Sequence, residues 1–166
     1  MITFQQLHFE FLALFRYKKS ERAWHVPFLA SLCVGIPLFT GCYLDKPAYG
    51  ITACIGGLVF LYLPTGSLAR RMITLLACSF GFVFAYAIGV LFSFNPYLSS
   101  IVLGLFAAFV HWVSRFFQLK PPGNFFFIMI ASIASCMPFA LEEIPVKVGL
   151  IAMGTMLATV IAFVYS

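Results

Sequence analysis

The sequence predicts an all-α integral membrane protein, a six-helix transmembrane bundle preceded by an N-terminal amphipathic helix at the membrane interface. The 166 residues are 63% hydrophobic and only 9% charged, whereas soluble domains are roughly 45–50% apolar and 25% charged. Six apolar stretches approach the ~20 residues needed to span a bilayer, and Pro, Gly and Asn separate them. We therefore expect an interfacial helix over 1–23 and one transmembrane domain over 24–166, without room for a soluble catalytic domain.

The first segment, 1–23, carries its apolar residues on one side at helical spacing. These residues are Phe4, Leu7, Phe11, Leu14 and Phe15, and a basic cluster follows at Arg16, Lys18, Lys19 and Arg22. The pattern favours a helix that lies in the interface with its basic end near anionic headgroups. The alternative is a short helix packed on an oligomeric partner. Because no small-residue cleavage site follows, we expect the segment to be retained.

Six stretches are expected to cross the membrane, and a turn signal separates each from the next. The stretches are Trp24–Leu44, Ala48–Leu63, Met72–Phe92, Tyr97–Ser114, Phe125–Leu141 and Val146–Tyr165. The turn signals are Asp45-Lys46-Pro47, Pro64-Thr65-Gly66, Asn95-Pro96, Pro121-Pro122-Gly123-Asn124 and Ile144-Pro145.

The basic residues predict the orientation of the chain. With a cytoplasmic N-terminus, the inner segments hold eight of the ten Lys and Arg residues, and the outer loops hold only Lys46 and Lys147. Cytoplasmic loops of membrane proteins are enriched in Lys and Arg. We therefore expect a multi-pass protein of the inner (cytoplasmic) membrane with both termini in the cytoplasm.

The net charge of +5 does not indicate a nucleic-acid partner, because the basic residues flank apolar stretches and form no polar face. The bilayer is the expected partner. None of the five cysteines forms a close pair with metal-ligand spacing. Phosphate-binding glycine loops, nucleophile elbows and paired carboxylates are also missing from the sequence. We predict no enzyme, no catalytic residue, no metal and no cofactor.

Small residues recur at four-residue intervals and predict close helix packing. The clearest run lies in the third span and continues in the fourth and sixth, with the packing residues Ala77, Gly81, Ala85, Gly89, Gly104 and Gly154. Almost any multi-pass protein has such stripes, so they predict a bundle and no particular activity.

The second and fifth spans occupy corresponding positions in two sets of three spans with opposite orientation. Both are short or interrupted by Gly and Pro, a feature that marks the binding sites of many transporters. The candidate path residues from these spans are Tyr49, Gly50, Gly57 and Pro138. Ordinary short helices are the alternative interpretation.

Basic residues gather at the expected inner face. His111 and Arg115 are four residues apart and share one helix face, and Arg70, Arg71 and Lys120 lie at the same membrane surface. These residues are expected to form a positive vestibule that attracts small anions, with His111 as a group that titrates near neutral pH. The alternative is that the arginines extend to lipid phosphates and His111 is an interface residue.

Residues 20–140 resemble the N-terminal membrane half of the fusaric acid resistance and aromatic acid exporter superfamily, to which the plant aluminium-activated malate channels are related. The resemblance rests on the basic stretch before the first span, Lys46-Pro47-Ala48-Tyr49-Gly50, Leu63-Pro64-Thr65-Gly66 with Arg70-Arg71, and the Pro121-Pro122 turn before a Phe-rich span. It implies six-helix bundles that occur twice in one chain or pair as dimers, each followed by a cytoplasmic domain. That domain has no counterpart before Ser166, so we expect a part of a longer polypeptide or a minimal subunit.

The resemblance also implies gradient-driven export of small, often aromatic, organic anions. We therefore expect a transporter module for such anions, acting as a homodimer or paired with a second homologous half. The alternative is a non-transporting membrane subunit that anchors or assembles a larger complex. A transporter requires the Gly and Pro interruptions to face a cavity, whereas in an anchor they face packed protein or lipid.

Overall fold

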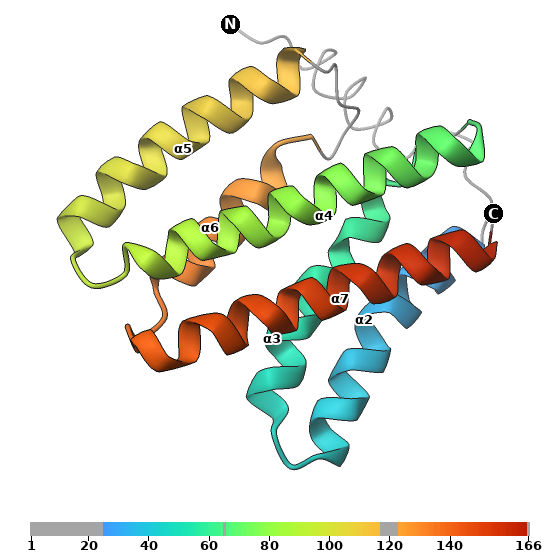
Figure 1. The fold of residues 1–166 in the computed structure, drawn as a ribbon, viewed down its shortest axis with the longest axis horizontal. Helices are drawn as coiled ribbons and strands as arrows, with labels where there is room; N and C mark the ends of the chain where they lie inside the picture. Colours follow the sequence, from blue (N-terminus) through green and yellow to red (C-terminus); the bar gives the residue numbers. More distant parts are fainter. Residues whose placement is uncertain (1–24, 65, 117–122, 166) are drawn as a thin grey trace, which may run out of the picture.

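The computed structural model describes residues 25–64, 66–116 and 123–165, and within these ranges every regular element is helical (Figure 1). The elements are α2 His25–Tyr43, α3 Pro47–Gly57, the 3-10 helix η1 Leu58–Tyr62, α4 Leu68–Leu91, α5 Pro96–Phe116, α6 Phe125–Ser135, the 3-10 helix η2 Leu141–Glu143 and α7 Ile144–Tyr165. The amphipathic helix expected over 1–23 and the path residue Lys120 lie outside the described residues.

Four of the described helical segments are long and apolar enough to cross a membrane: α2, α4, α5 and Leu141–Tyr165. The other two apolar segments are Pro47–Tyr62 and Phe125–Ser135. At about 1.5 Å per residue in α-helix and about 2.0 Å in 3-10 helix they measure roughly 26 Å and 17 Å, below the ~30 Å of hydrocarbon. Of the six expected spans, four are therefore long helices, and the second and fifth are short, as their Gly and Pro residues indicate.

Proline determines where both short helices stop. Leu63 adopts an extended conformation with φ −60° and ψ 110° after η1, as expected for a residue that precedes a proline, here Pro64. The helix expected over Phe125–Leu141 ends already at Ser135, and the chain between Met137 and Ala140 is not helical. Pro138 lies in that segment, and its ring prevents the helix from continuing.

The described α-helices form two sets of three, α2 to α4 and α5 to α7. The short helix of each set packs against the last helix of the other set. In the first set, α3 packs against α2 and against α7 of the second set; in return, α6 packs against α4. Figure 1 shows α4 and α7 side by side across the molecule, with α5 at one edge. Each short helix thus lies on the last long helix of the other set.

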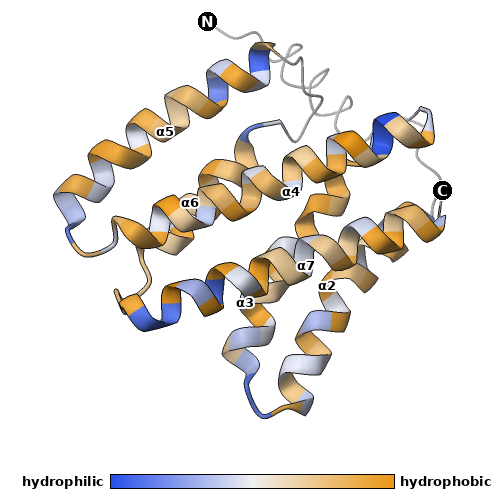
Figure 2. Ribbon diagram, in the orientation of Figure 1, coloured by the Kyte–Doolittle hydropathy of each residue, from blue (hydrophilic) through white to orange (hydrophobic). Residues whose placement is uncertain are grey.

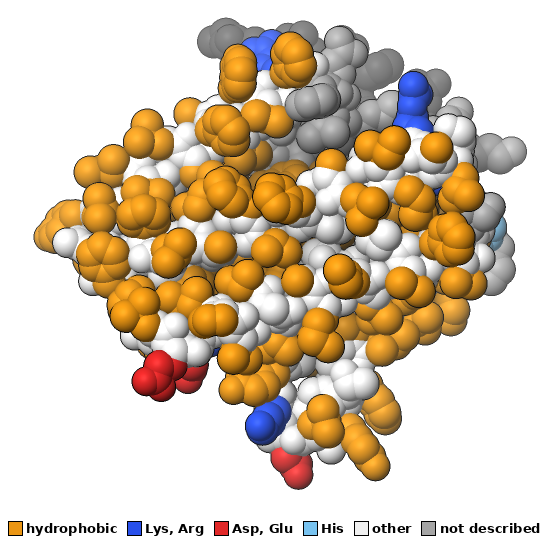
Figure 3. Space-filling view, viewed as in Figure 1, with side chains coloured by type: hydrophobic (Ala, Val, Ile, Leu, Met, Phe, Trp, Pro, Cys, Tyr) orange, Lys and Arg blue, Asp and Glu red, His pale blue; other side chains and the backbone are white. Residues whose placement is uncertain are grey.

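Among the described residues, charged side chains lie at the ends of the helices, and the face of the molecule between them is apolar (Figures 2 and 3). The described acids Asp45, Glu142 and Glu143 belong to the turns before α3 and α7, whereas the described arginines begin α4 and end α5. These two groups of helix ends lie at opposite ends of the molecule (Figure 1). Phe39 and Phe80 between them are 73% and 74% exposed, which fits a surface that faces lipid tails.

Candidate functional site

The two short helices meet at a buried tyrosine, the last residue of η1. The Tyr62 hydroxyl donates a hydrogen bond of 2.6 Å to the backbone carbonyl oxygen of Gly123, which shortly precedes α6. Tyr62 is only 7% exposed, so the Gly123 carbonyl oxygen provides its buried side chain with a hydrogen-bond partner. We call Tyr62, Phe82, Gly123 and Phe127 the short-helix junction.

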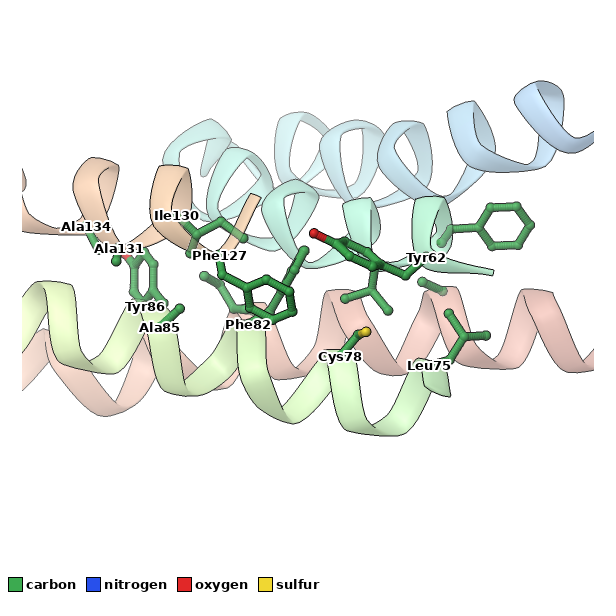
Figure 4. Close-up of a cluster of buried hydrophobic side chains, with 14 of the residues drawn as sticks. Tyr62, Leu75, Cys78, Phe82, Ala85, Tyr86, Phe127, Ile130, Ala131 and Ala134 are labelled. Carbon is green, nitrogen blue, oxygen red and sulfur yellow. The ribbon is translucent and has the colours of Figure 1, made fainter. Parts of the chain in front are cut away.

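Aromatic rings fill the short-helix junction (Figure 4). The Tyr62 ring lies 5.7 Å from Phe82 of α4 and 5.5 Å from Phe127 of α6, measured between centroids. Phe82 and Phe127 meet edge to face at 5.0 Å. Such T-shaped pairs are the favoured aromatic geometry. Packed rings therefore close the space between the ends of the two interrupted helices.

A second tyrosine holds the far end of α6. The Tyr86 hydroxyl of α4 lies 3.1 Å from the Met137 sulfur, just before the exposed loop residue Pro138. Tyr86 itself is fully buried. The path residue Pro138 therefore lies on the surface of a turn that α4 holds in place, and not in the interior of the bundle.

The glycines of the second span face packed helices. A side chain at Gly56 would overlap the carbonyl oxygen of Ile151 in α7, and one at Gly57 would lie 2.6 Å from the carbonyl oxygen of Cys33 in α2. Only glycine permits these backbones to approach so closely. The cavity expected beside Gly57 is therefore replaced by a contact between α3 and α2.

A groove does lie beside the beginning of α3. Its volume is about 320 Å³, and it is lined by residues of α2, α3 and α7 that include Tyr49, Gly50 and Leu157. The ammonium group of Lys46 lies 5.6 Å from the centroid of the Tyr49 ring, a cation–π contact at the mouth. Two of the expected path residues, Tyr49 and Gly50, thus border one groove, which Gly57 and Pro138 do not line.

The basic residues of the expected vestibule lie on two helix ends. Arg70 is exposed and Arg71 is half-buried in the first turn of α4, whereas the exposed Arg115 lies in the last turn of α5. His111 Nδ1 lies 3.3 Å from the Asn124 amide nitrogen, which can only donate. The structure therefore joins His111 to the chain before α6 and leaves the ends of α4 and α5 apart (Figure 1).

The expected packing residues lie in different environments. Gly89 is pressed against Ala131 of α6 and Gly154 against Ala53 of α3, so that each short helix contacts a long one backbone to backbone. Ala85 is fully buried and Gly81 lies on the ring of Phe127. Ala77 is exposed, and a Cβ at Gly104 would meet nothing within 4 Å among the described residues.

The sequence does not distinguish the junction residues Tyr62, Phe82 and Phe127, because they are aromatic residues in aromatic-rich stretches. Tyr62 carries the only available signal, a hydroxyl group just before the proline that ends a span.

Two further polar contacts lie at helix ends. His25 Nε2 contacts the Tyr165 hydroxyl, and the Lys147 ammonium lies 2.9 Å from the Glu143 carboxylate. Within the described ranges, no group of three or more His, Cys, Asp or Glu residues could hold a metal ion.

Comparison with known proteins supports membrane residence. The chain is similar to the uncharacterized membrane protein YvaC of Bacillus subtilis (strain 168), with 27% identity over 150 residues. These residues make up 90% of this chain and 24% of that protein, so the chain spans about a quarter of the relative's length. No family model matches the chain, and no solved structure matches it significantly. Together with the four long apolar helices, the similarity identifies a helical, multi-pass membrane protein.

Proposed function

We propose that the chain is a transporter module that exports small organic anions, aromatic ones among them, across the cytoplasmic membrane by using an ion gradient. One observation carries the proposal: two short, interrupted helices occupy corresponding places in two sets of three and meet at Tyr62 and Gly123. Broken helices in the corresponding members of inverted repeats form the substrate sites of many secondary transporters.

The proposed topology has six crossings with both termini in the cytoplasm. The short helices complete their crossings with non-helical segments, which a membrane tolerates where protein covers them. The Tyr62–Gly123 and Tyr86–Met137 contacts fix two such segments. Separation of the arginine-bearing helix ends from the acidic turns supports this orientation, because positive residues favour the cytoplasm.

The basic end of the molecule is the proposed entrance. Arg70, Arg71 and Arg115 raise the local concentration of anions there, and the His111 imidazole, in contact with the Asn124 amide, adds a polar group at the same end. The short-helix junction is the proposed barrier, because its packed rings must separate before an anion can pass. The resemblance to the aromatic acid exporters supports the substrate class, and it supports function as a homodimer or with a second homologous half.

Anion flux through reconstituted vesicles tests the proposal. The Arg71→Gln, Arg115→Gln double variant should reduce benzoate efflux per folded molecule, whereas Lys at both positions should retain part of it, because a vestibule acts through local potential. Raising the salt concentration should also reduce the flux, since screening acts over roughly 8–10 Å at physiological ionic strength. Lys147→Gln, at the opposite end and outside the lining of both grooves, is the matched control. An unchanged flux in the double variant would exclude the entrance.

A non-transporting subunit that anchors a larger complex is the second candidate. The packing of Gly56 against α7 and of Gly57 against α2 favours it, because the interruptions of the second span face protein. This candidate predicts that folded, reconstituted chain carries no benzoate flux above protein-free vesicles. Flux that depends on the arginines would exclude it.

A further inference from the structure

A second groove, about 380 Å³ in volume, runs between α4 and α5. We call it the α4–α5 groove; α4 lines it from Ile73 to Phe84, α5 from Phe106 to Ser114, and Phe127 of α6 lies between them. Among the described lining residues, only two hydroxyls and one thiol interrupt an apolar surface. One of these hydroxyls, on Thr74, donates to the Arg70 carbonyl oxygen at 2.9 Å. The groove therefore offers its occupant an almost wholly apolar surface.

The length of the groove matches one leaflet of a bilayer. From Ile73 to Phe84 the wall on α4 extends about 16 Å, at about 1.5 Å per residue, and the wall on α5 about 12 Å. Half of the ~30 Å hydrocarbon core is ~15 Å. An extended acyl chain fills such a groove, whereas a small aromatic acid would occupy only part of it.

The groove ends at positive charge. Arg70 lies one turn before its first lining residue on α4, and Arg115 directly follows its last lining residue on α5. Both arginines are exposed, and the described acids lie at the other end of the molecule. The only ion pair within the described ranges is between Glu143 and Lys147, also at that other end. An apolar groove with a cationic mouth matches an anionic amphiphile.

We propose that the α4–α5 groove binds an anionic phospholipid from the leaflet at the arginine end. One acyl chain lies along the groove, and the phosphate lies beside Arg70 or Arg115. The basic segment 16–22 of this chain is a poorer occupant of the mouth, because its four positive charges would face the two arginines. The proposal depends on membrane residence alone and does not require transport.

A photo-crosslinking experiment identifies the occupant. The full chain, with p-benzoylphenylalanine in place of the exposed groove residue Ala77, is placed in nanodiscs of equal phosphatidylglycerol and phosphatidylcholine, irradiated and analysed by mass spectrometry. The matched control carries the same photoprobe at Ala108, which is exposed on α5 outside the groove lining. Thermal unfolding checks that both proteins fold. As a measurement without the photoprobe, native mass spectrometry identifies the lipids that the unmodified chain retains.

We expect phosphatidylglycerol to be enriched about fivefold or more in adducts at Ala77, since one arginine near anionic lipid contributes about that factor. The Ala108 adducts should reflect the bulk mixture. The Arg70→Gln, Arg115→Gln variant should lose the enrichment at Ala77 and the preferential retention of phosphatidylglycerol. The proposal would be overturned by equal lipid ratios in the adducts at Ala77 and Ala108. It would also be overturned by adducts to residues 1–24 or to a second copy of the chain, or by displacement of the lipid by benzoate.

Discussion

The hydroxyl of Tyr62 reaches the carbonyl oxygen of Gly123 at 2.6 Å and so joins the end of one short helix to the beginning of the other. The two residues are 61 positions apart in the chain. The contact connects the two sets of three helices at the point where both lack regular α-helix. Its loss should therefore change the stability of the whole bundle and not of one helix alone.

The Tyr62→Phe variant tests this contact, because it removes the hydroxyl and keeps the ring between Phe82 and Phe127. We expect the free energy of unfolding to fall by about 1 kcal/mol, the usual value for such a hydrogen bond in water or in membranes. Unfolding with sodium dodecyl sulfate in mixed micelles measures it. Tyr43→Phe is the control, since the Tyr43 side chain is 81% exposed; equal losses in the two variants would contradict the assignment.

The crossing of α3 and α7 predicts a large effect of one methyl group. In Gly154→Ala the new Cβ would overlap the carbonyl oxygen of Ala53, and only a shift of a backbone can relieve the overlap. We expect the free energy of unfolding to fall by about 1–3 kcal/mol. Gly149→Ala on the same helix meets nothing within 4 Å among the described residues, so it should be neutral or stabilise by up to about 1 kcal/mol. Similar changes in both variants, measured by the same titration, would exclude close packing at Gly154.

The proposed topology predicts opposite labelling of two helix ends. In a background with the exposed Cys42 and Cys136 replaced by Ser, an impermeant maleimide added outside intact cells should modify Glu143→Cys and leave Arg115→Cys unmodified. Permeabilised cells should label both variants, which controls for folding and accessibility. Labelling of Glu143→Cys only after permeabilisation would reverse the orientation.

The proposed assembly predicts that the chain does not act alone. Because one bundle of four long and two short helices encloses little space, a transport path should form between two bundles. Mass measurement in nanodiscs should give a dimer or a complex with a second homologous half, and benzoate flux should appear only in that fraction. Flux from a fraction that contains a single copy would disprove the prediction.

By itself, the sequence determined the class of the protein and the places where its helices turn. Long apolar stretches require lipid, and prolines and glycines between them end helices by local chemistry. The bounds predicted for the first, third, fourth and sixth spans therefore lie within a turn or so of those of α2, α4, α5 and α7. The same local chemistry marked Pro138, although the apolar run past it concealed the early end of α6 at Ser135.

Only the tertiary structure decided which helices meet and what fills the space between them. Spans that face lipid are apolar on every side, so their periodicity does not show which face packs. The contact between Tyr62 and Gly123, the packing of Gly154 on Ala53 and the groove between α4 and α5 all join distant segments. Each depends on the exchange of short helices between the two sets, a choice made by close fit between backbones and not by any local pattern of residues.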